Sequence, residues 1–539
     1  MLIKEQNAIK KDWSPGKIKI GLIYPNTYRV AMTSLGVQLL YFLFNRHDNF
    51  LCERIFKPLD HRIPPYSLES QRKISDFDIL AISCQFEHDY LSAIELLHRG
   101  GINADIRKRT EKDPFIIMGG PSPTANPFPV LFLPDVFFLG DIEPIYVELS
   151  QAFENKSKKK IRESIASVNG IMGLGLHYNE EGEWFGEKIR SVKIKSISDA
   201  YYPIKQIIPE NVKGTKNEPI FGKAFYLETD RGCSERCLFC FTGHCRFPRA
   251  ARSFESLTKI IDQSEEVNNF EKVVIYGSAV AQSGRLDELI EYIVSKGYEV
   301  SCSSIRADYL TENLITALQK GKQRTIALAP ETGDETLRYA LNKRMSDETI
   351  FSAAKLAWDK GFRQLKMYMI YGFPCEKEEV KQKTFSFVKT MREQHFPTGK
   401  ISLSMNQFIT KAHTPLQFSR MNSLNESKDK QKWYRKNIFQ LKNVELSLYD
   451  PNWAIVQRIL SLRNQTYFSI IHQIGQMGNT IGNWKKALKN ENKSFADEAT
   501  WRYKIDDNLP WDKIIHKLDK RFLITSYEKY CDVLNCQED

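Results

Sequence analysis

The feature that most constrains this chain is the alternation of short apolar runs with helical segments over its first 155 residues. Strands that are separated by helices run parallel in one sheet, and helices then cover both faces of that sheet. Ligands bind such sheets at the carboxyl ends of the strands. We therefore predict an α/β domain over residues 1–155, with strands at 17–24, 76–83, 114–120 and 135–141.

The alternation restarts after residue 223 with six strand–helix units. Six units are too few for a closed eight-fold barrel, so we expect a curved, partly open parallel barrel over residues 223–424. Residues 156–222 are interpreted as an irregular linker whose lysine-rich run is a solvated connector. Residues 425–539 read as mainly helical. The six barrel strands are expected at 224–229, 272–277, 299–304, 324–330, 364–372 and 401–408.

Composition limits the class of protein. Hydrophobic residues make up 42% and charged residues 27% of the chain, which excludes wholesale disorder. The net charge of +11 suits anionic ligands or nucleic acid, but it is spread over 539 residues and identifies neither. No run approaches the ~20 apolar residues of a membrane helix. The first residues have no apolar secretory core, so we expect a cytoplasmic protein.

Four of the ten cysteines fall within one short segment, directly after an expected strand. Cys233, Cys237 and Cys240 have the spacing C-x3-C-x2-C, and three thiolates can bind three irons of a [4Fe–4S] cluster. The fourth iron then stays open for a small molecule. The alternative is a structural zinc site, completed by Cys245 or His244. The other cysteines are expected to be reduced thiols: Cys52, Cys84, Cys302, Cys375, Cys531 and Cys536.

This spacing, with Phe239 just before the third cysteine, resembles the radical S-adenosylmethionine (SAM) superfamily. The resemblance implies that Cys233, Cys237 and Cys240 hold a [4Fe–4S] cluster whose fourth iron binds SAM through its amino and carboxylate groups. Electron donation from the cluster would cleave SAM to a 5′-deoxyadenosyl radical. The resemblance also implies an electron donor such as ferredoxin or flavodoxin.

Later segments are similar to the superfamily's SAM-binding motifs in order and spacing. They are 275–284, 303–310, 329–350 and 365–376. In the first, the superfamily's acidic residue is absent. The resemblance implies SAM contacts at Phe239, Gly277, Ser278, Ser303, Ser304, Arg306, Glu331 and Lys366.

Segments 24–45, 75–87, 118–129 and 408–415 look like the branch of the superfamily that carries an N-terminal cobalamin-binding-like domain. The implied architecture is an N-terminal Rossmann-like domain, a partial (β/α)6 radical SAM barrel and a helical C-terminal region. The chain has no D-x-H-x-x-G motif for a cobalt ligand, and His88 is interpreted as a surface residue at a helix start. Strand-end position and the resemblance suggest corrinoid contacts at Ser83, Gly119, Gly120 and Pro121.

The hypothesis that follows is a cobalamin-dependent radical SAM methyltransferase acting on an unactivated carbon. One alternative is a cobalamin-independent radical SAM enzyme for rearrangement, ring formation or sulfur insertion, with the N-terminal domain as a docking module. Another is a zinc-stabilised RNA-binding protein, suggested by basic stretches with aromatics at 428–436 and 484–489. These stretches lack an RNA-binding motif. The substrate stays open, because the fold does not specify it.

Overall fold

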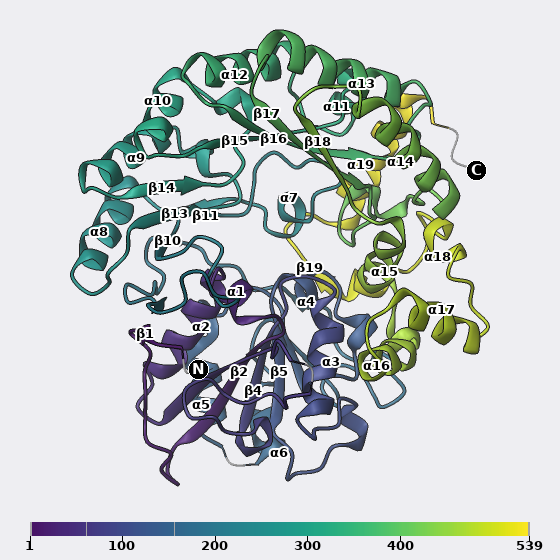
Figure 1. Cartoon of the computed structure of the whole chain (residues 1–539). Helices are drawn as coiled ribbons and strands as arrows, with labels where there is room; N and C mark the ends of the chain where they lie inside the picture. The colour runs from purple at the N-terminus through teal and green to yellow at the C-terminus, as the bar shows by residue number, and fades with distance from the viewer. Residues whose placement is uncertain (1–2, 61, 156, 537–539) are drawn as a thin grey trace.

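The computed structural model describes residues 3–60, 62–155 and 157–536 (Figure 1). Its first domain is built on a six-stranded sheet of order β3-β2-β4-β5-β6-β7. The first five of these strands are parallel, and β7 joins β6 in the antiparallel direction. The strands are β2 (Ile18–Tyr24), β3 (Phe50–Phe56), β4 (Ile79–Ser83), β5 (Phe115–Gly119), β6 (Val136–Phe138) and β7 (Ile171–Gly173).

Helices cover both faces of this sheet. On one face, the apolar side chains of α2 (Leu35–Asn45), α5 (Tyr146–Phe153) and α6 (Lys158–Ile165) share one core with the strands. On the other face, α3 (Asp89–Arg99) packs against α16 (Phe468–Met477), a helix from the far end of the chain. The core of the first domain is therefore completed by the C-terminal region, in which α15 (Pro451–Leu462) and α17 (Ile481–Asn490) also contribute.

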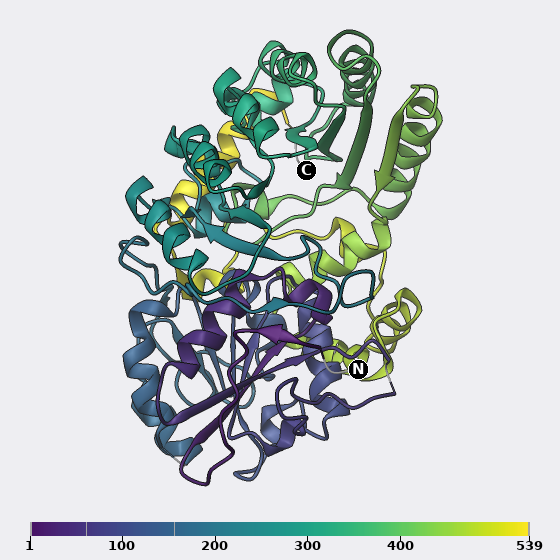
Figure 2. The same cartoon turned by 60° about the vertical axis from the view of Figure 1, so that its left-hand side comes forward.

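The second domain is a curved, open barrel of parallel strands with helices on its outer side (Figures 1 and 2). It consists of a three-stranded and a four-stranded sheet, joined where the amide of Ile305 donates to the carbonyl of Ala327 (3.1 Å). The predicted fold class is thereby confirmed. The strands are β10 (Ala224–Glu228), β13 (Lys272–Tyr276), β14 (Glu299–Cys302), β15 (Thr325–Glu331), β16 (Gln364–Tyr371), β17 (Lys400–Gln407) and β18 (Val444–Leu448).

Burial alternates along the barrel strands. In β16, Leu365, Met367 and Met369 are buried, while Lys366 and Tyr368 between them are half-buried. Successive side chains of a strand point to opposite faces, so the apolar set packs under the outer helices and the polar set lines the concave side. The helices that supply the outer layer include α8 (Phe254–Glu265), α9 (Leu286–Ser295), α10 (Glu312–Lys320), α12 (Asp347–Asp359) and α13 (Val380–Thr390).

The elements that were not expected from the sequence include β3, β18 and α6. β3 reads FLCERIF, and its two charged residues interrupt the apolar run. β18 is half-buried on one face and exposed on the other, and it extends the barrel by a seventh parallel strand. The lysine-rich run contributes to α6, where Lys158 is buried and donates to the carbonyl of Thr110 (2.6 Å). Residue 156 of that run lies outside the described residues.

The interpretation of Cys375 and Cys536 as free thiols is wrong, because the structure joins them in a disulfide. Cys375 follows β16, whereas Cys536 follows α19 (Lys520–Leu534), and 161 residues separate the two in sequence. The spacing of these cysteines in the sequence does not predict such a pairing. The remaining eight cysteines form no disulfide. None of the described helices is long and apolar enough to cross a membrane.

Arg54 on β3 is fully buried between two carboxylates. Its Nη2 lies 2.6 Å from Glu5, and its Nε lies 2.7 Å from Glu69, with each carboxylate less than 5% exposed. Arg54→Met should lower the free energy of unfolding by ~3–5 kcal/mol in urea, since both carboxylates lose their partner in the core. The matched control is Arg62→Met, which removes an ion pair of a 90% exposed side chain and should have little effect. Equal losses in the two variants would contradict this.

Candidate functional site

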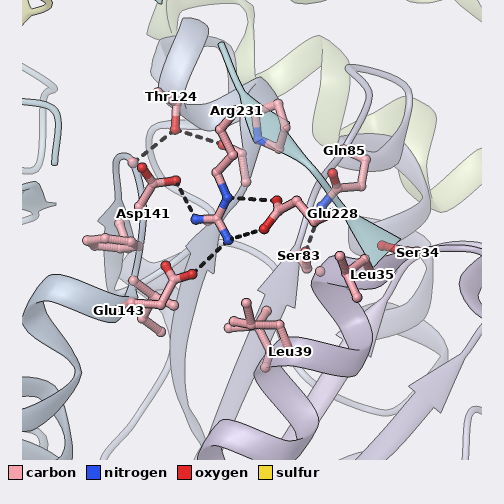
Figure 3. Close-up of a pocket in the computed structure, with 18 of the residues that line it drawn as sticks. Ser34, Leu35, Leu39, Ser83, Gln85, Thr124, Asp141, Glu143, Glu228 and Arg231 are labelled. Atoms are coloured by element: carbon pink, nitrogen blue, oxygen red, sulfur yellow. Dashed lines mark hydrogen bonds and ion pairs between the residues drawn. The ribbon is translucent and has the colours of Figure 1, made fainter. Parts of the chain in front are cut away.

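A cavity of about 620 Å³ lies where the carboxyl ends of the N-terminal strands face the start of the barrel (Figure 3). One wall is apolar and comes from α2 and the N-terminal sheet, with Leu35, Leu39 and Phe138 among its side chains. The opposite wall comes from the segments that follow β10 and β13. The cavity therefore joins the two domains at the edge where parallel sheets bind ligands.

Arg231 stands at the centre of the polar wall (Figure 3). Its guanidinium contacts Glu228 (2.8 Å) at the end of β10, and Asp141 (3.2 Å) and Glu143 (2.8 Å) beyond β6. Burial lowers the pKa of Arg231, but the three carboxylates outweigh burial and raise the pKa above its ordinary value. Asp141 also pairs with Arg246 (2.7 Å). These ion pairs tie the first domain to the segment just before the cysteine loop.

The cysteine loop follows this arginine directly. Cys233, Cys237 and Cys240 are half-buried and form no disulfide. The loop is held from outside, because the amide of Leu238 donates to the carbonyl of Leu341 (3.0 Å), and Asn342 donates to the carbonyl of Glu235 (2.9 Å). Burial raises the pKa of Cys237 to about 12, so its thiol stays protonated unless a metal displaces the proton. Three free thiols on one loop fit the donor set of an iron–sulfur cluster.

Charged groups from the next strands surround Cys237. Its pKa responds to Lys343, Glu331 and Arg306, which places their charges close to the thiol. Glu331 ends β15 and pairs with Lys343 (2.5 Å). Arg306 follows β14 and pairs with Glu235 of the cysteine loop (3.2 Å) and with Asp308 (2.7 Å). The structure thus brings two of the expected SAM residues, Arg306 and Glu331, to the cysteine loop.

The backbone of the glycine-rich segment after β13 donates hydrogen bonds to a carboxylate. Oδ1 of Asp230 accepts hydrogen bonds from the amides of Ser278 and Ala279 (both 2.9 Å). A Cβ added to Gly277 would lie 2.3 Å from Oδ2 of the same aspartate. A larger residue at position 277 would therefore collide with the carboxylate of Asp230. Asp230, from the neighbouring segment, places an acidic side chain beside a motif that has none of its own. Gly277 and Ser278 both line the cavity.

The remaining SAM candidates lie apart from the cavity lining. Ser303 and Ser304 are exposed beyond the end of β14. Phe239 packs against Phe373, with ring centroids 5.6 Å apart. Lys366 lies on the concave side of β16, with its Nζ 4.7 Å from the ring centroid of Tyr368.

All four expected corrinoid residues line the cavity: Ser83, Gly119, Gly120 and Pro121. Gly120 has φ +112°, and a Cβ there would lie 2.3 Å from the carbonyl oxygen of Cys84. Pro121 begins α4 (Pro121–Ala125). Among the described residues that line the cavity there is no histidine. His88 precedes α3 and lies against Phe86, with ring centroids 5.2 Å apart.

One group of residues at the cavity wall was not predicted from the sequence, namely the ion-pair cluster of Asp141, Glu143, Glu228, Arg231 and Arg246. A signal was present, because Glu228 and Arg231 stand just before the cysteine motif and Asp141 ends a predicted strand. Opposite charges at two separate strand ends suit an inter-domain contact, but the sequence does not show which ends meet.

The fold and site define an α/β enzyme with three thiols at the mouth of an open barrel. Two family models match the chain: "Radical SAM proteins, N-terminal" over residues 36–173 and "Radical SAM superfamily" over residues 227–388. The chain belongs to the radical SAM superfamily, and the resemblance drawn from its motifs is confirmed. The cofactors of this superfamily are a [4Fe–4S] cluster and SAM, which agrees with the donor set of the cysteine loop.

Known proteins share the whole architecture. The uncharacterized protein MJ0966 of Methanocaldococcus jannaschii is 27% identical over 485 residues, which cover 90% of this chain and 98% of that protein. The radical SAM methyltransferase TsrM from Kitasatospora setae, solved with cobalamin and a [4Fe-4S] cluster bound, has a TM-score of 0.51 at 13% identity, covering 88% of this chain and 100% of that one. The cobalamin-dependent radical enzyme OxsB, solved with aqua-cobalamin, has a TM-score of 0.50 at 13% identity, covering 96% and 80%. At these identities the two solved structures show a shared fold.

Gly232 sets the start of the cysteine loop. Its φ is +81°, and an added Cβ would lie 2.1 Å from the carbonyl oxygen of Arg246. Gly232→Ala should therefore displace the loop and remove most of the cluster iron, although all three cysteines remain. Iron analysis after anaerobic reconstitution measures this. The control is Gly222→Ala, which also has a positive φ (+68°) but has no atom within 4 Å of the added Cβ. Full iron occupancy in Gly232→Ala would refute this role.

Proposed function

We propose that the cavity holds a corrinoid next to SAM and that the chain is a cobalamin-dependent radical SAM methyltransferase acting on an unactivated carbon. The observation that carries the proposal is that one cavity is lined both by the glycine pair at the end of β5 and by Gly277 and Ser278 at the end of β13. A ligand bound by the first domain would therefore meet the SAM side of the barrel. The cobalamin-binding TsrM and OxsB share this domain order.

The lining suits a large, flat ligand with an apolar face and polar edges. Leu35, Leu39 and Phe138 offer apolar contact, while Ser83 and the amides near Gly120 offer polar contact at the rim. Ligand sites are mostly apolar with a few placed polar groups. Since the described lining includes no histidine, the proposed corrinoid would bind without an imidazole ligand from this wall.

Three groups of the chain would hold the cluster and SAM. Cys233, Cys237 and Cys240 would bind three irons, which leaves the fourth for SAM. Glu331 would accept hydrogen bonds from ribose hydroxyls, and Arg306 would bind a carboxylate in bidentate geometry. The other proposed SAM contacts are Phe239, Gly277, Ser278, Ser303, Ser304 and Lys366.

When bound, the cluster and SAM supply a carbon-centred radical for hydrogen abstraction, and the corrinoid supplies a methyl group. The residues of this chain position these groups and exclude water. Arg231 and its carboxylates would hold the two domains at a fixed separation, so that the corrinoid site and the SAM site stay in register. The open concave side of the barrel would admit the substrate.

The cobalamin-independent alternative keeps the radical step and assigns the cavity to substrate docking. The RNA-binding alternative is disfavoured by burial. Tyr434 and Trp484, which stand in the two basic stretches, are 1% and 0% exposed. Aromatic rings that stack on bases must be accessible. These rings instead pack in the cores of the two domains.

Corrinoid binding by the full chain tests the proposal. An anaerobic hydroxocobalamin titration should saturate at one corrinoid per chain. Gly36→Trp should weaken binding by about tenfold or more, equal to ~1.4 kcal/mol, because Gly36 lines the cavity and its side-chain position has room, with Ser34 Oγ 3.6 Å from an added Cβ. Gly36→Ala is the matched control and should bind normally.

The same assay shows whether corrinoid binding depends on the iron–sulfur cluster. The triple variant Cys233→Ala/Cys237→Ala/Cys240→Ala should lose the cluster and SAM cleavage but keep corrinoid binding. A wild-type chain that cleaves SAM but binds no corrinoid would instead establish the cobalamin-independent alternative.

SAM binding tests the two charged residues beside Cys237. Glu331→Gln and Arg306→Ala should keep the cluster and near-native thermal stability, but weaken SAM affinity by the ~1–3 kcal/mol typical of a charged hydrogen bond. Isothermal titration of the cluster-loaded protein measures this. The control is Glu291→Gln, which removes an exposed ion pair with Lys320 on the outer helices (3.0 Å). If the variants lose stability while the folded fraction binds SAM normally, Glu331 and Arg306 belong to the scaffold.

A further inference from the structure

Three side chains outside the cluster loop's motif form a compact group of metal-ligand type. They are Cys245 at the end of α7 (Phe241–Cys245), His413 in the loop after β17, and His516 just after β19 (Ile514–Ile515). Their ligand atoms all lie within 4.8 Å of one another. In the described part of the chain, this is the one group of at least three His, Cys, Asp or Glu side chains that gathers so closely.

The group is buried, and three of its ring nitrogens make no hydrogen bond of normal geometry. Cys245 is 0% exposed, and His413 and His516 are each 8% exposed. Among the described residues, Nε2 of His413 and both ring nitrogens of His516 make no hydrogen bond of normal geometry, although the backbone of Ala125 lies near the first ring and that of Thr124 near the second. A buried polar atom without a partner is costly, and a bound metal ion would supply the partner. The two rings meet edge to face, with centroids 4.3 Å apart.

The donor set identifies the kind of ion. Two imidazoles and one thiolate suit a divalent metal of borderline softness, and zinc accepts this combination in tetrahedral sites. Three protein ligands leave the fourth position to a water molecule. We propose that Cys245, His413 and His516 bind one zinc ion, at a site separate from the iron–sulfur cluster.

Two cations lie near the group, and each already has a partner. Lys193 and Arg246 are the cations that act on Cys245. Arg246 is already paired with Asp141 (2.7 Å), and Lys193 donates to the carbonyl of Phe247 (2.5 Å). The thiolate of Cys245 would cancel one of the two positive charges of the zinc ion, which leaves a net charge of +1 at the site.

The position of the group shows which segments the ion would connect. Cys240, the third cysteine of the cluster motif, precedes α7, and Cys245 ends that helix. The helix contacts α4, which carries the cavity residue Pro121. A zinc ion would therefore join the cluster loop to two segments that lie about 170 and 270 residues further along the chain. Zinc has no redox chemistry of its own, so such an ion would fix the loop without drawing electrons from the cluster.

Metal analysis of the anaerobically purified full chain tests the inference. Zinc and iron are measured together by mass spectrometry. We expect one zinc per chain in addition to the cluster iron. Cys245→Ser and His516→Ala should lose at least tenfold in bound zinc. The matched control is His244→Gln, which removes a buried histidine on the same helix whose Nδ1 lies 2.9 Å from the carbonyl oxygen of Cys240. It should keep its zinc.

A second measurement tests the inference if the single ligand variants fail to fold. The triple variant Cys233→Ala/Cys237→Ala/Cys240→Ala lacks the absorbing cluster and should still take up one Co²⁺, with a thiolate-to-cobalt absorption band. Adding Cys245→Ser should abolish that band. The inference is overturned if the wild-type chain binds no zinc, or if zinc disappears with the triple variant. Zinc that survives in folded Cys245→Ser and His516→Ala proteins would overturn it as well.

Discussion

The ion pairs of Arg231 are the interaction on which the rest of the site depends. They join Asp141 and Glu143, which follow β6 of the first domain, to Arg231, which stands two residues before the first cysteine of the motif. Buried charges lose their hydration and are stable only when their partners are well placed. Asp141 and Glu143 therefore fix the distance between the cavity wall and the cysteine loop. The chemistry proposed here requires that distance to be constant.

Much of the fold could be predicted because apolar runs report buried parallel strands directly. The exceptions have physical causes. β3 carries Glu53 and Arg54, and charged residues in a sequence predict an exposed segment. In the structure both are buried, and Arg54 forms ion pairs with Glu5 and Glu69 from elsewhere in the chain. β18 has only one sheltered face, so its pattern is weak. The Cys375–Cys536 disulfide joins segments that only the tertiary fold brings together.

The residues of the candidate site also fall into those that the sequence predicts and those that it does not. The cysteine motif and the glycine pair at Gly119 and Gly120 are local patterns, and the sequence predicts them with their residue numbers. The partners of Arg231 and the Cys245–His413–His516 group are assembled from distant segments, so no spacing reveals them. Gly277 shows an intermediate case. The resemblance implies a SAM contact there, but only the structure shows that the side chain of Asp230 lies against this glycine.

The packing of α16 on α3 has a consequence for how the chain folds during synthesis. The core of the first domain includes Leu91 and Ile94 from its own helix together with Ile470 and Ile471 from near the end of the chain. When a ribosome has made only the first third of the protein, that apolar surface has no cover. The N-terminal sheet can reach its native packing only after the whole barrel has been translated. The barrel is thus an insertion, in folding order, between two parts of one core, and until it is made the chain exposes apolar surface of the kind that promotes aggregation.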